Sequence, residues 1–129
     1  MAYPANFRYS REHEWIEVAG SIGSIGITDY AQNSLGDIVY VDMPKVGDAV
    51  TANATFGSVE SVKAVSDLFA PVTGTVTAVN EELRTSPDKI NEKPHETWII
   101  KVELTDPSQI NALLDAAAYE AFIAEETGS

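Results

Sequence analysis

Lys63 is the residue of this chain whose type and setting could most readily do chemistry. It lies between two segments rich in valine and serine, residues 57–62 and 64–69, and this composition favours β-strands. It is the only basic residue between Lys45 and Arg84. If both flanks are strands, Lys63 stands at or near the tip of a β-hairpin, with its amine in solvent.

An exposed lysine on a rigid turn suits the covalent attachment of a prosthetic arm. The small neighbours Ser61, Val62 and Ala64 leave room for a modifying enzyme, and the finished arm could reach further enzymes. A Schiff-base lysine would instead need burial to lower its pKa. On residue type alone, an ordinary solvated lysine on a turn is the simpler interpretation.

The rest of the sequence offers little for catalysis. The chain has no cysteine and two histidines, His13 and His95, without metal-ligand spacing. We expect both to be structural or surface residues, and we expect Trp15 and Trp98 to pack in the core. A hydrolase or lyase that uses Lys63 directly is disfavoured, because the sequence shows no base, nucleophile or apolar pocket for it.

Length and charge narrow the class of protein further. The 129 residues fit one domain, and 8 basic against 20 acidic residues give a net charge of −12. This charge argues against nucleic acid and anionic membranes as partners and favours partners with basic surfaces. No apolar run approaches the ~20 residues of a membrane span. No apolar segment follows residues 1–4, so we expect a cytoplasmic protein, with a mature mitochondrial form as the alternative.

The pattern of the chain predicts a mainly β body. Residues 13–27 read as a hairpin, and further strands are expected at residues 37–42, 49–51, 56–62, 71–79 and 98–104. A short helix is predicted over residues 29–35, capped by Thr28 and ended by Gly36. Residues 86–94 read as a polar loop. After Asp106 and Pro107, helical spacing of apolar residues predicts a C-terminal helix over residues 108–125.

Five ordered segments resemble the H proteins of the glycine cleavage system. One surrounds the lysine: Glu60-Ser61-Val62-Lys63-Ala64, then Ser66-Asp67 and residues 70–74. The others are residues 13–15, 26–32, 35–39 and 106–108, and residues 119–123 also match. Related carrier domains place a glutamate three residues before the lysine and turn glycines sixteen before and eleven after it; here these are Glu60, Gly47 and Gly74.

The resemblance implies a barrel-sandwich hybrid fold over residues 1–129, with a lipoyl group amide-linked to Lys63. It implies a monomeric shuttle rather than an enzyme. Glycine decarboxylase (the P protein) would load an aminomethyl group onto the arm, and the aminomethyltransferase (the T protein) would remove it. Dihydrolipoamide dehydrogenase (the L protein) would reoxidise the arm, and a lipoate-attaching enzyme would install it.

Acidic residues beside the arm are candidates for contact with the aminomethyl amine. We expect Glu14 and Asp67 in this role because both lie in matching segments and a carboxylate suits an ammonium group; ordinary surface carboxylates are the competing interpretation. The family usually has another polar residue at Glu12.

Other carriers stay open as alternatives. One is a relay that hands lipoyl or octanoyl groups to other proteins, and another is a biotinyl-type carrier, which usually has methionines beside its lysine rather than Val62 and Ala64. An unmodified scaffold protein is a third.

Overall fold

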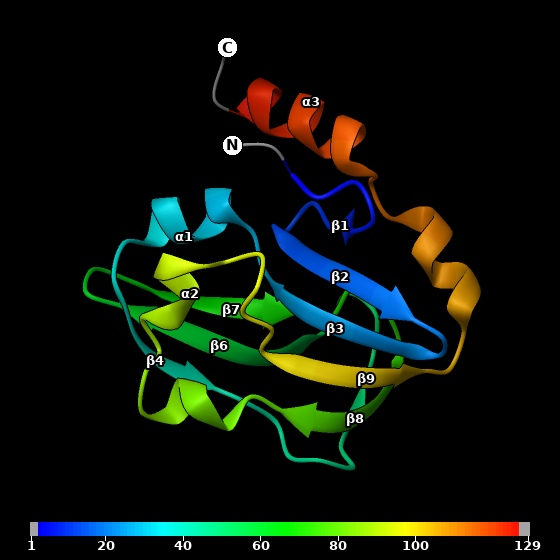
Figure 1. Cartoon of the computed structure of the whole chain (residues 1–129), viewed down its shortest axis with the longest axis horizontal. Coiled ribbons are helices and arrows are strands. Elements are labelled where there is room, and N and C mark those ends of the chain that lie inside the picture. Colours follow the sequence, from blue (N-terminus) through cyan, green and yellow to red (C-terminus); the bar gives the residue numbers. More distant parts are fainter. Residues whose placement is uncertain (1–2, 127–129) are drawn as a thin grey trace.

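The computed structural model describes residues 3–126 and shows a mainly β protein built from two antiparallel sheets (Figure 1). The larger sheet has the strand order β1-β2-β3-β9-β8-β5 and the smaller has the order β4-β6-β7. The strands are β1 (Arg8–Tyr9), β2 (Glu14–Ala19), β3 (Ile22–Ile27), β4 (Ile38–Asp42), β5 (Ala49–Val50), β6 (Thr55–Ser61), β7 (Val65–Phe69), β8 (Gly74–Val79) and β9 (Ile100–Leu104). This confirms the predicted fold class.

Alternation along the strands directs one face of each sheet into a common core. In β9, Ile100, Val102 and Leu104 are buried, whereas Glu103 is exposed. In β6 and β4, Val59 and Val41 are directly paired and both buried. Period-two burial of this kind leaves the opposite face of each sheet for solvent or for partners.

The helix α1 (Asp29–Leu35) has the bounds and caps that the sequence predicts. Thr28 Oγ1 accepts a hydrogen bond from the amide of Ala31, and Gly36 ends the helix with a φ of +82°. A positive φ is costly for most side chains, so glycine suits this position. The caps fix the direction in which the chain passes from β3 to β4.

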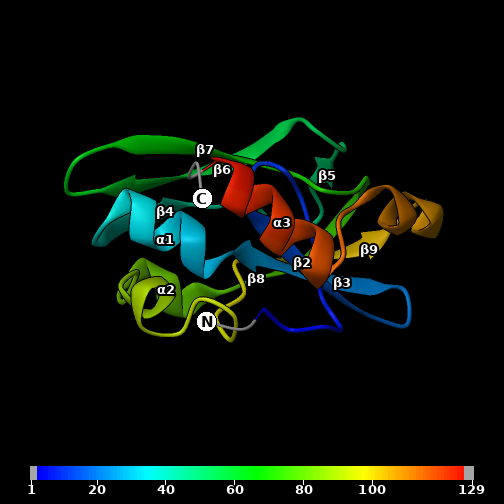
Figure 2. The ribbon, with the colours of Figure 1, turned by 90° about the horizontal axis from the view of Figure 1, so that it is seen from above.

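The predicted C-terminal helix is confirmed, but the predicted bounds of residues 108–125 are too long at the start. A 3₁₀ segment, η2 (Pro107–Ala112), is separated from the helix α3 (Ala116–Glu126) by extended backbone at Leu113. The cause is a long-range pairing: Leu114 and Tyr9 exchange two backbone hydrogen bonds of 2.8 Å. Figure 2 shows α3 crossing above β2 after this break.

Two further expectations also need correction. Residues 86–94 contain the short helix α2 (Lys89–Glu92), which follows the 3₁₀ turn η1 (Glu81–Arg84). The strand expected from residue 98 begins only at Ile100, because the carbonyl of Trp98 is bonded by the side-chain amide of Asn80. Within residues 3–126, no helix is both long and apolar enough to cross a membrane.

Candidate functional site

Lys63 lies in the three-residue turn that joins β6 to β7, at one end of the molecule (Figure 1). The turn is organised by Ser61, whose Oγ accepts from the amides of Lys63 at 3.3 Å and Ala64 at 3.1 Å. The Ser61 amide in turn donates to the Ala64 carbonyl at 2.8 Å. A neighbouring segment also supports the turn, because the Val62 amide donates to the Asp37 carbonyl at 3.0 Å. The lysine therefore projects from a well-bonded turn.

The side chain of Lys63 is exposed and passes the C-terminal end of α1. Its Cε lies 3.6 Å from the position that a Cβ on Gly36 would occupy. Val62 and Ala64 are also exposed, and Val62 shows 68% of its surface to solvent. The amine is accessible to another protein, as the sequence predicts for a hairpin tip.

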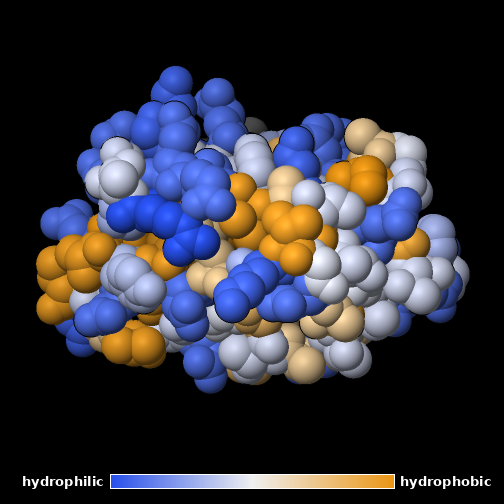
Figure 3. All heavy atoms as spheres, turned by 90° about the horizontal axis from the view of Figure 1, so that it is seen from below, coloured by the Kyte–Doolittle hydropathy of each residue, from blue (hydrophilic) through white to orange (hydrophobic). Residues whose placement is uncertain are grey.

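The outer face of the smaller sheet carries apolar and acidic side chains next to the turn. Two rows of directly paired residues cross it, Tyr40–Glu60–Val65 and Asp42–Ser58–Asp67. Tyr40 is 52% and Val65 is 68% exposed, and Glu60 and Asp67 are exposed as well. In Figure 3, hydrophobic surface gathers at the end where Figure 1 places the β6–β7 turn. Such a surface has the composition of a protein-docking patch.

Glu14 is a buried carboxyl group at the other end of β7. Its side chain is bonded by the hydroxyl of Ser10 at 2.6 Å and by the amide of Phe69 at 3.2 Å. Burial is the largest influence on this group and raises the pKa of Glu14 to about 8, against which the two hydrogen bonds act. At neutral pH this carboxyl group is therefore largely protonated.

The turn before Glu14 is bonded to the C-terminal helix, which sequence reasoning missed. His13 Nδ1 lies 2.8 Å from the hydroxyl of Tyr119, and His13 Nε2 lies 3.0 Å from a carboxylate oxygen of Glu126. The Tyr119 hydroxyl also lies 2.7 Å from Thr28 Oγ1. We call these contacts among Tyr119, Thr28 and His13 the Tyr119–Thr28–His13 joint. The only signal for this joint in the sequence is the matching segment at residues 119–123, because His13 and Tyr119 are far apart along the chain.

The other histidine is structural, in agreement with the expectation. His95 Nε2 accepts from the amide of Asp29 at 3.2 Å, at the start of α1. Burial lowers the pKa of His95, so the neutral ring that this bond requires is favoured.

Comparison with known families identifies the chain. The model of the glycine cleavage H-protein family matches residues 7–126. This chain belongs to that family.

Individual H proteins are similar over nearly the whole chain. The chain is 68% identical to the glycine cleavage system H protein of Acidobacterium capsulatum and 65% identical to that of Koribacter versatilis, with 99% of each chain covered in both cases. A crystal structure of a glycine cleavage system H protein from Mycobacterium marinum matches with a TM-score of 0.85 at 35% identity, over 98% of this chain and 100% of that one. As an H-family member, the protein is the lipoyl-bearing shuttle of the glycine cleavage system.

The two predicted turn glycines of this H-family chain lie away from Lys63: Gly47 in the turn before β5, and Gly74 at the start of β8 in the larger sheet. Gly47 adopts a φ of +98°, and its amide donates to the Val76 carbonyl on β8. Gly74 pairs with Val50, and a Cβ on Gly74 would clash with the Glu103 carbonyl oxygen. Gly47 therefore supplies a backbone conformation that suits glycine, and Gly74 permits the close approach of β9; neither belongs to the Lys63 turn.

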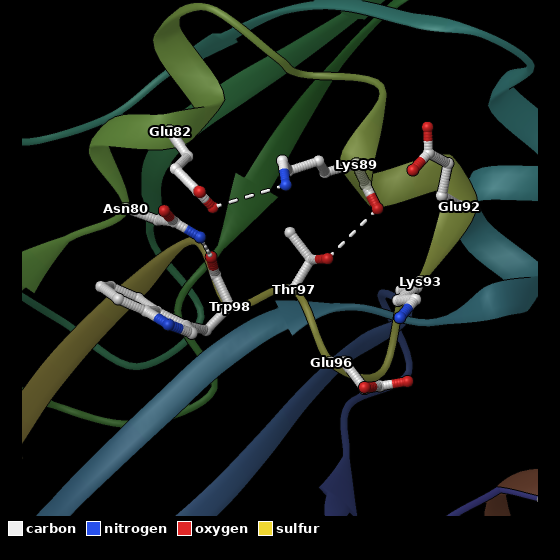
Figure 4. Close-up of a pocket in the computed structure, with 8 residues that line it drawn as sticks. All are labelled: Asn80, Glu82, Lys89, Glu92, Lys93, Glu96, Thr97 and Trp98. Carbon is white, nitrogen blue, oxygen red and sulfur yellow. Dashed lines mark hydrogen bonds and ion pairs between the residues drawn. The ribbon is translucent and has the colours of Figure 1, made fainter.

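A pocket of about 560 Å³ lies away from the Lys63 turn and is lined by residues between Asn80 and Trp98 (Figure 4). Its side chains bond mostly to their neighbours: Lys89 pairs with Glu82 at 3.8 Å, and Thr97 donates to the Lys89 carbonyl. It contains none of the predicted arm residues. In the described part of the chain, no group of three His, Cys, Asp or Glu residues is arranged to hold a metal.

Proposed function

We propose that Lys63 is the residue that carries the lipoyl group, in amide linkage, and that residues 1–129 form a single monomeric carrier rather than an enzyme. The observation that carries this proposal is the position of Lys63 on a turn fixed by Ser61, with its side chain exposed. Small neighbours and an exposed amine fit an attachment reaction by another enzyme. When bound, the lipoyl group supplies the disulfide and dithiol chemistry that carries an aminomethyl group and electrons.

The proposed partners are those that must reach the arm in turn. They are glycine decarboxylase, the aminomethyltransferase, dihydrolipoamide dehydrogenase and the enzyme that attaches lipoate. The apolar and acidic face around Tyr40, Glu60 and Val65 adjoins the turn, so each partner that handles the arm approaches this face. Sequential partners require small, short-lived interfaces.

Asp67 is an exposed acidic residue within the length of the arm. Between the Cα and the ring sulfur of a lipoyl-lysine, about a dozen bonds of roughly 1.5 Å form a zigzag about 15 Å long. From Lys63 to Asp67 the strand advances four residues, or ~13 Å at the usual strand rise. Asp67 is exposed and lies on the same outer row as Ser58, so its carboxylate can bind a cationic amine on the arm.

Glu14 lies farther along β7 from Lys63 than Asp67 does. Its carboxyl group is bonded to the amide of Phe69, two residues beyond Asp67. Glu14 is protonated at neutral pH in the absence of a cation, because burial raises its pKa to about 8. An ammonium group beside it would favour the carboxylate form and would be held by it. We therefore assign Glu14 a supporting role behind Asp67.

The attachment site is tested by intact mass and peptide mapping of the protein from lipoate-supplied cells. The expected result is a lipoyl-sized mass increase on Lys63, which Lys63→Arg abolishes. Lys45→Arg is the matched control, because Lys45 is also an exposed loop lysine and its replacement leaves the modification intact. A bare Lys63 in cells that lipoylate other proteins would overturn the proposal.

A further inference from the structure

One buried hydroxyl, that of Tyr119, connects three elements around Glu14. Tyr119 belongs to α3 and is fully buried. Its hydroxyl lies 2.8 Å from His13 Nδ1, next to Glu14 in the chain, and 2.7 Å from Oγ1 of Thr28, the cap of α1. The C-terminal helix is thus bonded to the turn that carries Glu14 and to the helix that Lys63 passes.

The hydrogen bonds around Tyr119 form a continuous chain in which every donor has an acceptor. The Ala31 amide donates to Thr28 Oγ1, and the Thr28 hydroxyl can donate to Tyr119. The Tyr119 hydroxyl can then donate to His13 Nδ1, and Nε2–H is left for Glu126. Burial raises the pKa of Tyr119, so its hydroxyl keeps the proton that these hydrogen bonds need.

The backbone of His13 shows why such support is needed. His13 has a φ of +70°, in the left-handed region that side chains other than glycine seldom adopt. Its amide donates to the Ser10 carbonyl, and its carbonyl accepts from the Thr28 amide. A residue in this conformation persists only when its surroundings fix it. Both polar partners of its ring come from α3, and Tyr30 of α1 also packs against the ring, with centroids 4.7 Å apart.

We propose that Tyr119 is a positioning residue for the arm site: its hydroxyl fixes the Glu14 turn against the start of α1. The inference rests on the proposed function, in which the arm leaves Lys63 beside Gly36. The seven residues of α1 span ~10 Å at the usual helical rise. Lys63 lies at one end of this helix, and the Tyr119–Thr28–His13 joint lies at the other. Through this joint α3 sets where Glu14 stands relative to the arm.

The test compares Tyr119→Phe with Tyr9→Phe in the full, unmodified chain. Tyr9 is an unusually close match: it is also fully buried, and its ring stacks on that of Tyr119 with centroids 4.8 Å apart. Its hydroxyl, however, donates to the Pro4 carbonyl. Each substitution removes one buried hydroxyl from the same aromatic cluster, and only Tyr119→Phe breaks the joint.

The decisive measurement is an NMR titration of the Glu14 carboxyl group. In Tyr119→Phe we expect the pKa of Glu14 to fall from about 8 by about one unit or more, because the released turn admits water. Hydrogen exchange at the Ala31 amide should accelerate about tenfold. Tyr9→Phe should change neither. An unchanged Glu14 titration in Tyr119→Phe, or equal shifts in both variants, would overturn the proposal.

A second pair of variants applies if Tyr119→Phe does not fold. Thr28→Val removes the hydroxyl that meets Tyr119, and Thr28→Ser keeps it. Loss of the helix cap alone would change exchange at Ala31 but not the titration of Glu14. We expect Thr28→Val to lower the pKa of Glu14 and Thr28→Ser to restore it; equal values in the two variants contradict the proposal. None of these measurements needs the lipoyl group, so they are independent of whether Lys63 is modified.

Discussion

Glu14 makes the stability of this protein depend on pH in an unusual direction. Burial raises the pKa of its carboxyl group to about 8. Between the ordinary value of 4.5 and about 8, the folded state keeps a proton that the unfolded state has released. Stability contributed by this group is therefore complete below pH 4.5 and decreases as the pH rises towards 8.

Glu14→Gln should remove this loss of folding stability at high pH. We expect the variant to equal the parent protein near pH 4 and to exceed it by a few kcal/mol near pH 8.5, because Gln is never ionised and can still bond Ser10 and Phe69. Urea unfolding at pH 4, 6 and 8.5 measures the difference. Glu17→Gln, at an exposed carboxyl group on the same strand, β2, should leave the pH profile unchanged. A constant difference between Glu14→Gln and the parent protein at all three pH values would contradict this account.

Asp67 should act on the loaded arm and not on the fold. Because Asp67 is exposed and within the arm's ~15 Å reach, Asp67→Asn should leave unfolding unchanged and should speed loss of the one-carbon unit several-fold. Mass spectrometry of the loaded protein over time measures this rate. Asp42→Asn is the control, since Asp42 is exposed on the same row but on the far strand, β4. Equal rates of loss in the two variants would show that Asp67 does not bind the amine on the arm.

What the sequence predicts about single residues depends on how local their contacts are. The exposure of Lys63 followed from its own neighbours, and Thr28 was recognised as a cap from the residues beside it. The burial of Glu14 was not predictable, because its amide partner, Phe69, is 55 residues away. The partners of His13 lie 106 and 113 residues away, beyond any local pattern.

Among the elements, the β6–β7 turn should depend on Ser61. Ser61→Ala removes the oxygen that accepts from the amides of Lys63 and Ala64, and these bonds resemble those of a helix cap. We expect a loss of ~1–2 kcal/mol in stability and a lower rate of lipoate attachment. Denaturant unfolding and an attachment assay measure the two effects. Ser58→Ala, on the outer face of the same strand, is the control, and an attachment rate unchanged by Ser61→Ala would contradict a preorganised turn.

The outer face of the smaller sheet should determine recognition of the turn. We expect Tyr40→Ser to reduce kcat/KM for lipoate attachment about tenfold, or ~1.4 kcal/mol, because Tyr40 is 52% exposed beside Glu60. Val46→Ser is the matched control, since Val46 is 62% exposed between β4 and β5. Equal kcat/KM values for the two variants would exclude Tyr40 from the docking surface.

Element boundaries show where periodicity stops being informative. Helical spacing of apolar residues correctly predicted helix near the C-terminus, but it could not reveal the break at Leu113. That break exists because Leu114 pairs with Tyr9, and a period in one segment says nothing about a partner in another. By contrast, α1 carries its start and stop signals within its own sequence, so its bounds were correct.

For the molecule as a whole, the net charge of −12 should control encounter rates. Partners with basic surfaces are attracted over about one Debye length, which shrinks from roughly 10 Å at 0.1 M salt to 3 Å at 1 M. We expect association with dihydrolipoamide dehydrogenase to slow several-fold over this range, with little change in dissociation. Stopped-flow kinetics measures both rates; an association rate independent of salt would show that the charge serves solubility alone.

The pairing of Tyr9 with Leu114 also has a consequence for biosynthesis. The first strand cannot find this partner until almost the whole chain has left the ribosome, and Tyr119 emerges later still. Contacts between residues so distant in sequence form slowly and close the fold last. The β6–β7 hairpin, in contrast, is contained within residues 55–69. The nascent protein thus presents its lysine before it has finished the helix that positions Glu14, so an attachment enzyme could recognise chains whose arm site is still unassembled.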